Sequence, residues 1–193
     1  MPQVGSPAAP SPEQLRVLAA AQARARKVYR AARVASFSGW TTAILSAGTL
    51  IGAILDPMAL PLGFALAIIA WVELHGAAEL RRFEAVAPGR LALNQVAFMC
   101  VLVVWAGWGL MQTVTGGNVY DAQIAATPQL APTLRPLGEL AMFISILFYG
   151  LVAGGSVIVQ GGAAIYYFSR RRHLDEFIRN TPDWAVAMLR ATH

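Results

Sequence analysis

Four long apolar stretches alternate with shorter polar ones along the chain, and this pattern predicts four helices that cross a membrane. The expected spans are residues 34–55, 58–80, 91–113 and 140–168. The first contains no charged residue over 22 positions, which is enough to cross a hydrocarbon core of roughly 30 Å at about 1.5 Å per residue. The fold class expected from this pattern is all-α, as an integral membrane four-helix bundle.

The second span is the one that brings charge to membrane depth. Its uncharged part, residues 58–72, has only 15 positions, too few to cross without taking Glu73 and His75 into the membrane or its interface. An ionisable residue at that depth is rare in membrane helices and is often functional. We expect this helix to continue to a turn at Pro88-Gly89, because proline and glycine together interrupt helices.

The N-terminal region divides into two segments. Residues 1–10 are rich in proline and alanine without periodicity, which predicts disorder. Residues 11–33 have alanine-rich and basic faces at helical spacing, which predicts an amphipathic cytoplasmic helix that begins in a capping box of Ser11 and Gln14. Its basic face suits an anionic membrane surface, and packing on the protein's own cytoplasmic hairpin is the alternative interpretation.

Two polar segments follow the third and fourth spans. Residues 114–138 contain three prolines and three glycines, which predicts the one substantial external loop, with a short helix at residues 121–126. Residues 169–193 carry five of the 15 Lys and Arg side chains. They are expected to form a basic cytoplasmic tail that ends in a short interfacial helix.

Composition and charge support the membrane class and orient the chain. Hydrophobic residues make up 56% and charged residues 13% of the sequence, and the mean hydropathy is +0.53, outside the usual balance of soluble domains. Of the 15 basic residues, only Arg135 lies outside the N-terminal segment, the second connection and the C-terminal tail. The positive-inside rule therefore predicts a multi-pass protein of the cytoplasmic membrane with both termini cytoplasmic. Because basic residues flank apolar spans, the net charge of +5 does not indicate nucleic-acid binding.

Pairs of glycines at four-residue spacing occur in two of the spans. They are Gly48 and Gly52 in the first span, and Gly150 and Gly154 in the fourth. Such notches let helix backbones approach closely in lipid, where helices gain little from the hydrophobic effect. Packing within the bundle is the favoured interpretation, and homo-oligomerisation is the alternative.

Polar residues gather near the cytoplasmic ends of the spans. Glu73 is the ionisable member, and Asn94, Gln95 and Gln160 are its candidate hydrogen-bond partners. Interhelical hydrogen bonding that sets the helix register is the favoured interpretation. The alternative is a half-channel or ligand pocket that opens to the cytoplasm.

Helical spacing also groups three charged or polar residues outside this layer. His75, Glu79 and Arg82 follow one another at spacings of four and three, so they share a helix face and are expected to form a charge row. The sequence contains no HExxH motif, cysteine cluster or phosphate-binding glycine loop, so we expect no metal, cofactor or catalytic residue.

Several motifs resemble those of small, uncharacterised four-span bacterial membrane proteins. The resemblance covers about half of the chain and rests on Glu73-Leu-His-Gly, Glu79-Leu-Arg-Arg, Leu91-Ala-Leu-Asn-Gln, Ala164-Ile-Tyr-Tyr, Arg170-Arg-Arg and Asn180-Thr-Pro-Asp-Trp. It implies a protein of the bacterial inner membrane and supplies no catalytic residues. The expected function is that of a non-enzymatic accessory, scaffolding or partner-binding subunit. The alternative is a small proton, cation or solute transporter or channel that uses the layer around Glu73.

Overall fold

The computed structural model describes residues 11–191, and all the regular structure in that range is helical. Four of the helices are long and apolar enough to cross a membrane. The elements in chain order are α1 (Pro12–Gly52), η1 (Pro57–Ala59), α2 (Leu60–Arg81), α3 (Ala87–Thr115), α4 (Asp121–Ala126), η2 (Pro128–Leu130), α5 (Ala131–Arg179) and α6 (Asp183–Ala191). The predicted disorder of residues 1–10 lies outside the described residues.

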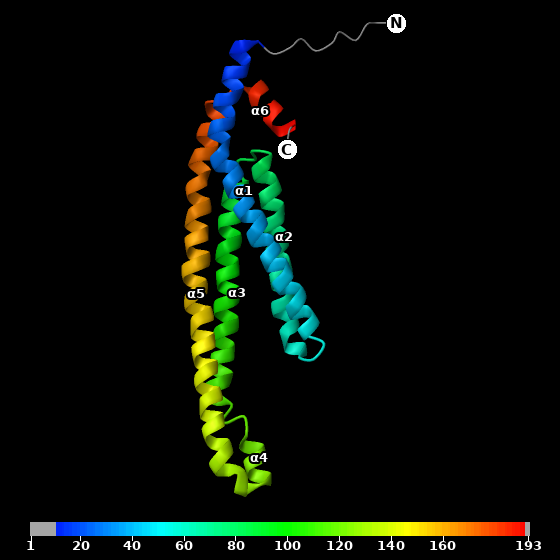
Figure 1. Ribbon diagram of the computed structural model, residues 1–193, viewed down its shortest axis with the longest axis vertical. Helices are drawn as coiled ribbons and strands as arrows, with labels where there is room; N and C mark the ends of the chain where they lie inside the picture. The colour runs from blue at the N-terminus through cyan, green and yellow to red at the C-terminus, as the bar shows by residue number, and fades with distance from the viewer. Residues whose placement is uncertain (1–10, 192–193) are drawn as a thin grey trace, which may run out of the picture.

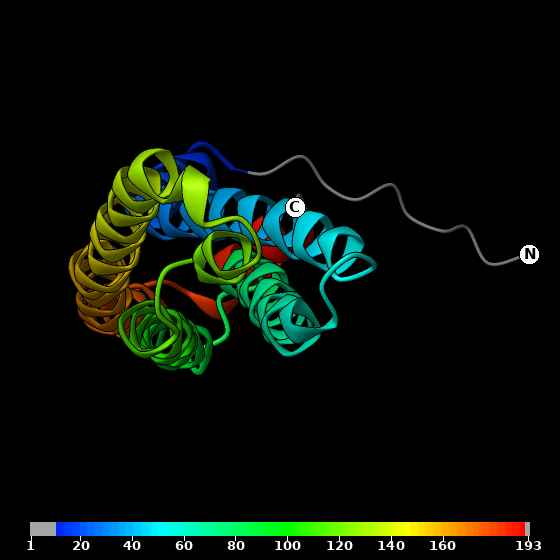
Figure 2. The ribbon, with the colours of Figure 1, turned by 90° about the horizontal axis from the view of Figure 1, so that it is seen from below.

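The long helices form two hairpins that meet at one end. Helix α1 packs along α2, and α3 packs along α5, whereas contacts between α2 and α3 are fewer. Figure 1 shows the two hairpins together near α6 and diverging toward the opposite end of the molecule. Viewed from below, the four helices surround a common axis (Figure 2). The polar end near α6 is therefore where the hairpins are joined.

Helix α1 runs without a break from the segment expected at residues 11–33 into the span expected at residues 34–55, and it ends at Gly52. The predicted capping box is confirmed: the Ser11 N–H donates to Gln14 Oε1 at 2.8 Å, and the Gln14 N–H donates to Ser11 Oγ at 3.2 Å. Because α1 is a single helix of 41 residues, its basic N-terminal half is a direct extension of its apolar half.

The expected loop at residues 114–138 is partly helical. The short helix expected at residues 121–126 is confirmed as α4, but α5 already begins at Ala131, so the interpretation of the last part of this segment as loop was wrong. Pro132 lies in the first turn of α5, where its missing N–H costs no helical hydrogen bond. Pro136 lies inside the helix and removes one such bond. Helix α5 also continues to Arg179, well beyond the span expected at residues 140–168.

The turn between α2 and α3 centres on Phe83 and not on Pro88-Gly89. Phe83 has a φ of 56°, a left-handed conformation that costs a residue other than glycine about 1–2 kcal/mol. The Phe83 N–H donates to the carbonyl of Leu80, and the Glu84 N–H donates to the carbonyl of Glu79, which is the hydrogen-bond pattern of a Schellman motif. The side chain of Phe83 is buried against Tyr29 and Phe177, with ring centroids 5.4 and 4.7 Å away. Losing such a side chain typically costs 3–5 kcal/mol, roughly twice the backbone strain.

The largest buried cluster surrounds this turn. Its walls come from the alanine-rich face of α1, the ends of α2 and α5, the start of α3, and α6. Helix α6 contributes Ala185, Val186 and Leu189 to it, so the C-terminal part of the tail expected at residues 169–193 is packed onto the bundle. The alanine face that we expected to lie on a membrane surface or on the protein itself is thus occupied by the protein's own helices.

The four glycines predicted to mediate packing within the bundle do not do so. A Cβ atom added to Gly48, Gly52, Gly150 or Gly154 would have no neighbour within 4 Å. The favoured interpretation was wrong because a four-residue spacing reveals a notch on a helix but not the direction it faces. Other glycines make the close contacts. The clearest is Gly76 in α2, where an added Cβ would lie 2.6 Å from Cδ2 of the buried Leu91 side chain in α3.

We predict that Gly76→Ala destabilises the protein and that Gly48→Ala does not. The new methyl group at position 76 would overlap Leu91, and such overpacking typically costs 1–3 kcal/mol. At position 48 the added methyl group meets open space. Thermal unfolding of the purified protein in detergent should therefore show a lower Tm for Gly76→Ala alone. Equal Tm values for the two variants would contradict the helix contact at Gly76.

Candidate functional site

A buried polar cluster centres on the carboxyl group of Glu73 in α2. Glu73 is only 1% exposed. Asn94 Nδ2 donates to Glu73 Oε2 at 2.8 Å, and Gln95 Nε2 lies 2.9 and 3.0 Å from the two carboxyl oxygens. The Tyr167 hydroxyl donates to Glu73 Oε1 at 3.0 Å. Both oxygens of the carboxyl group are therefore satisfied by neutral donors.

The cluster joins the two helical hairpins. Asn94 and Gln95 come from α3 and Tyr167 from α5, while Glu73 belongs to α2. Asn94 Nδ2 also donates to the backbone carbonyl of Ile69 at 3.1 Å, which ties α3 to α2 a second time. Ser38 of α1 is a further neighbour of the Glu73 carboxyl group. All four long helices thus converge on one side chain.

Hydrogen bonds hold this carboxyl group without an opposing cation. In the described part of the chain the one ion pair joins Glu79 and Arg90, and Glu73 takes no part in it. A buried carboxyl group is costly unless its oxygens are hydrogen-bonded, and each such bond contributes about 0.5–1.5 kcal/mol. The cluster therefore stabilises the helix arrangement that brings the three donors to Glu73.

Gln160 does not join the cluster, and Tyr167 takes the place expected for it. The Oε1 atom of Gln160 is buried without a hydrogen-bond partner among the described residues. Tyr167 lies seven residues later on α5, on the same helix face two turns away. In the sequence, Tyr167 stands just before the basic run that begins at Arg170, a position where tyrosines commonly anchor a span at the membrane interface. The signal that could have identified Tyr167 as a partner of Glu73 is that a buried tyrosine hydroxyl normally needs a hydrogen-bond partner.

The expected charge row of His75, Glu79 and Arg82 is not formed. The His75 ring is exposed and stacks on Trp71, with centroids 4.3 Å apart. Glu79 pairs with Arg90 of α3. The Arg82 backbone carbonyl accepts a hydrogen bond from Arg190 Nε at 2.8 Å. The Glu79 side chain finds its partner on α3 and not on its own helix, which spacing along α2 cannot reveal.

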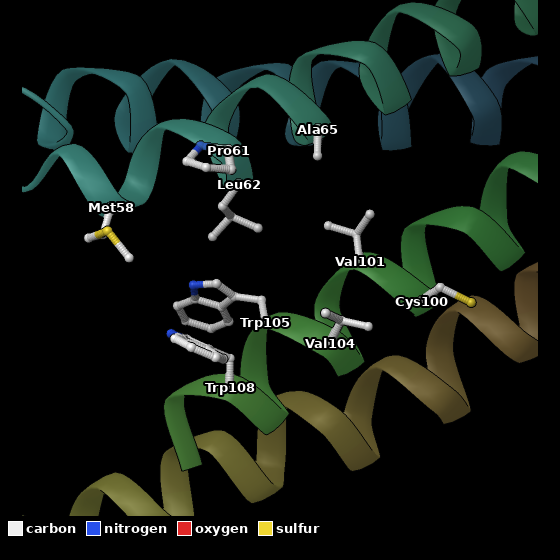
Figure 3. A pocket seen from close by; sticks show the side chains of 9 residues that line it. All are labelled: Met58, Pro61, Leu62, Ala65, Cys100, Val101, Val104, Trp105 and Trp108. Carbon is white, nitrogen blue, oxygen red and sulfur yellow. The ribbon is translucent and has the colours of Figure 1, made fainter. Parts of the chain in front are cut away.

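An apolar groove of about 500 Å³ lies between α2 and α3. Figure 3 shows Met58, Pro61 and Leu62 on one side, facing the rings of Trp105 and Trp108 on α3. The remaining lining residues are Ala65, Cys100, Val101 and Val104. No pattern in the sequence indicates this groove, because the groove depends on the angle between the two hairpins.

The described residues contain no cluster of side chains suited to binding a metal ion. Within residues 11–191, no group of three or more His, Cys, Asp or Glu side chains is arranged to hold a metal ion. Cys100 is a free, exposed thiol on α3.

We predict that Tyr167→Phe destabilises the protein, whereas Tyr166→Phe leaves its stability unchanged. The first substitution removes a buried hydrogen bond to Glu73, with an expected cost of about 0.5–1.5 kcal/mol. Tyr166 keeps its ring contact with Arg170, because the guanidinium carbon lies over the ring at 4.5 Å from its centroid. Denaturant unfolding in detergent measures both effects.

A double-mutant cycle that combines Tyr167→Phe with Glu73→Leu separates the interaction from general damage. The two costs should be strongly non-additive, because each substitution disturbs the same hydrogen bond. Additive costs would mean that Tyr167 and Glu73 do not interact.

The chain matches no known family model, and neither the curated proteins nor the solved structures contain a match to it.

Proposed function

We propose that this chain is a four-span protein of the bacterial cytoplasmic membrane that acts as a non-enzymatic scaffolding or partner-binding subunit. The four long apolar helices support the membrane placement. The segregation of the basic residues supports cytoplasmic termini, because all of them except Arg135 belong to segments on one side of the four spans.

The observation that carries the partner-binding proposal is the exposure of α5. Only 6% of the residues in its most apolar 18-residue stretch are buried, compared with 33% in α3. Gly150 and Gly154 lie in this exposed region with open space around them. In lipid, small residues on an exposed helix face permit close packing of another helix. Helix α5 therefore offers an outward surface for a partner subunit or a second copy.

The cluster around Glu73 fits a structural role in this proposal. Its carboxyl oxygens are engaged by Asn94, Gln95 and Tyr167, and its residue is sealed from solvent. Such a cluster keeps the hairpins in register while leaving the outer surface of the bundle free. A rigid frame with a free helix face is what a scaffolding subunit requires.

A transporter or channel that uses Glu73 is the alternative function. The feature in its favour is a buried ionisable group without a cationic partner. It requires water to reach a side chain that is 1% exposed, and hence a large conformational change. Proton or cation flux in vesicles that disappears in Glu73→Gln would favour this alternative over the scaffolding role.

Membrane placement predicts a defined pattern of thiol labelling. In a Cys100→Ser background, a single cysteine introduced by Gln129→Cys should react with a membrane-impermeant maleimide on intact cells. A cysteine introduced by Ala19→Cys should react only after the membrane is permeabilised, because the positive-inside rule assigns it to the cytoplasm. The reverse pattern would contradict the orientation, and labelling of both sites on intact cells would contradict the four-span topology.

The role of α5 predicts that bulky residues at its glycines disrupt a complex. The wild-type chain should migrate in mild detergent as a species larger than its own 20.6 kDa, whereas Gly150→Ile with Gly154→Ile should migrate as the monomer. The matched control is Ile158→Leu, an exposed position on the same helix. It should leave both the complex and the Tm unchanged. A wild-type protein that is purely monomeric would count directly against a partner-binding subunit.

A further inference from the structure

A second pocket lies where the start of α3 meets the basic part of α5. It has a volume of about 480 Å³. Arg90 and Leu93 of α3 and Arg171 and Asp175 of α5 line it, together with Gly89 and the turn residues Ala85 and Val86. Two arginines from different helices thus line one concave site beside exposed apolar side chains.

The electrostatics of this pocket favour an anion. Arg90 is paired with Glu79, but a guanidinium group has five N–H donors, so the pair leaves donors for a ligand. Within residues 11–191, Arg171 makes no hydrogen bond or ion pair. Asp175 opposes these groups with one negative charge.

An exposed apolar track leads away from the pocket along α3. Leu93, Ala97, Cys100, Val104 and Trp108 follow one another at spacings of four, three, four and four, so they share one face of the helix. All five are exposed, and Leu93 and Val104 are about 70% exposed. Cys100, Val104 and Trp108 also line the apolar groove between α2 and α3. The basic pocket and the apolar groove are therefore two ends of one continuous surface.

The length of this surface matches one leaflet of a bilayer. Arg90 and Cys100 are ten residues apart, which corresponds to about 15 Å along a helix. Half of a hydrocarbon core of roughly 30 Å is the same distance. A lipid with its headgroup at Arg90 would accordingly end its acyl chain near Cys100, at the edge of the groove.

We propose that this surface is a binding site for an anionic phospholipid of the cytoplasmic leaflet. Arg90 and Arg171 hold the headgroup phosphate, and an acyl chain lies along Leu93 and Ala97 to Cys100. The assignment rests on the proposed membrane placement, because only that placement sets the pocket at the level of lipid headgroups. Charge complementarity selects an anionic over a zwitterionic lipid.

Cys100 allows a direct test, because it is the only cysteine in the chain and its thiol is exposed. The protein, with a fluorophore attached to Cys100, is reconstituted in vesicles of phosphatidylglycerol and phosphatidylcholine at one fixed ratio. In one preparation the phosphatidylglycerol is brominated, and in the other the phosphatidylcholine is brominated. The anionic lipid should be enriched beside the fluorophore about fivefold, which corresponds to about 1 kcal/mol for one basic side chain near the surface. Bromine on the acyl chains of phosphatidylglycerol should therefore quench the fluorophore more strongly than the lipid ratio alone would predict.

Matched variants separate the site from diffuse surface charge. Arg90→Gln with Arg171→Gln should abolish the preference, whereas Arg26→Gln with Arg172→Gln removes the same charge from exposed positions outside the pocket and should preserve it. Asp175→Asn should strengthen the preference by removing the opposing carboxylate. Equal loss in both double variants, or no preference in the wild type, would overturn the proposal. Loss of the preference on adding inorganic phosphate would indicate a site for the phosphate group alone and would also overturn it.

Quenching of the same fluorophore by iodide in the aqueous phase distinguishes the absence of a lipid site from a failure of the proposed membrane placement. A fluorophore at Cys100 that is shielded from iodide lies within the bilayer, so absence of a lipid preference then contradicts the lipid site alone. A fluorophore that iodide quenches freely contradicts the proposed four-span placement itself.

Discussion

The hydrogen bonds to the buried carboxyl group of Glu73 are the interaction on which the helix arrangement depends. Each of the two hairpins has a long internal interface, but the contact between α2 and α3 is smaller. Donors from α3 and α5 reach one acidic side chain of α2, and an unsatisfied buried acid would cost several kcal/mol. Alternative registers of the hairpins would leave these groups unpaired, so the cluster selects one arrangement among several that apolar packing alone would allow.

The same end of the molecule is reinforced by packing around the turn between α2 and α3. Phe83 accepts a left-handed backbone because its ring is buried with Tyr29 and Phe177. Helix α6 then closes this cluster. Toward the opposite end the hairpins diverge (Figure 1), and the groove lined by the α3 tryptophans results. A strong junction at one end and separation at the other follow from where the polar and aromatic contacts lie.

This asymmetry unites the two proposals about function. The junction uses the inward side chains of the bundle, so the outer surfaces of α3 and α5 stay available. On the proposed placement, α5 presents its open glycines to another helix, and α3 presents a basic pocket and an apolar track to a lipid. A scaffold of this kind would combine a fixed frame with separate surfaces for protein and lipid.

The sequence by itself determined the helical class, the capping box at Ser11 and the short helix at residues 121–126, because these depend on local spacing. It also indicated the pairing of Glu73 with Asn94 and Gln95, because acidic residues are scarce in apolar stretches and need hydrogen-bond partners there. Tertiary structure decided that Tyr167 and not Gln160 completes the cluster, that Arg90 pairs with Glu79, and that Gly76 makes a close helix contact while Gly48 meets open space. Spacing within one helix fixes which residues share a face. Which face meets which neighbour depends on the rotation and crossing of several helices, and that is set only when all of their contacts form together.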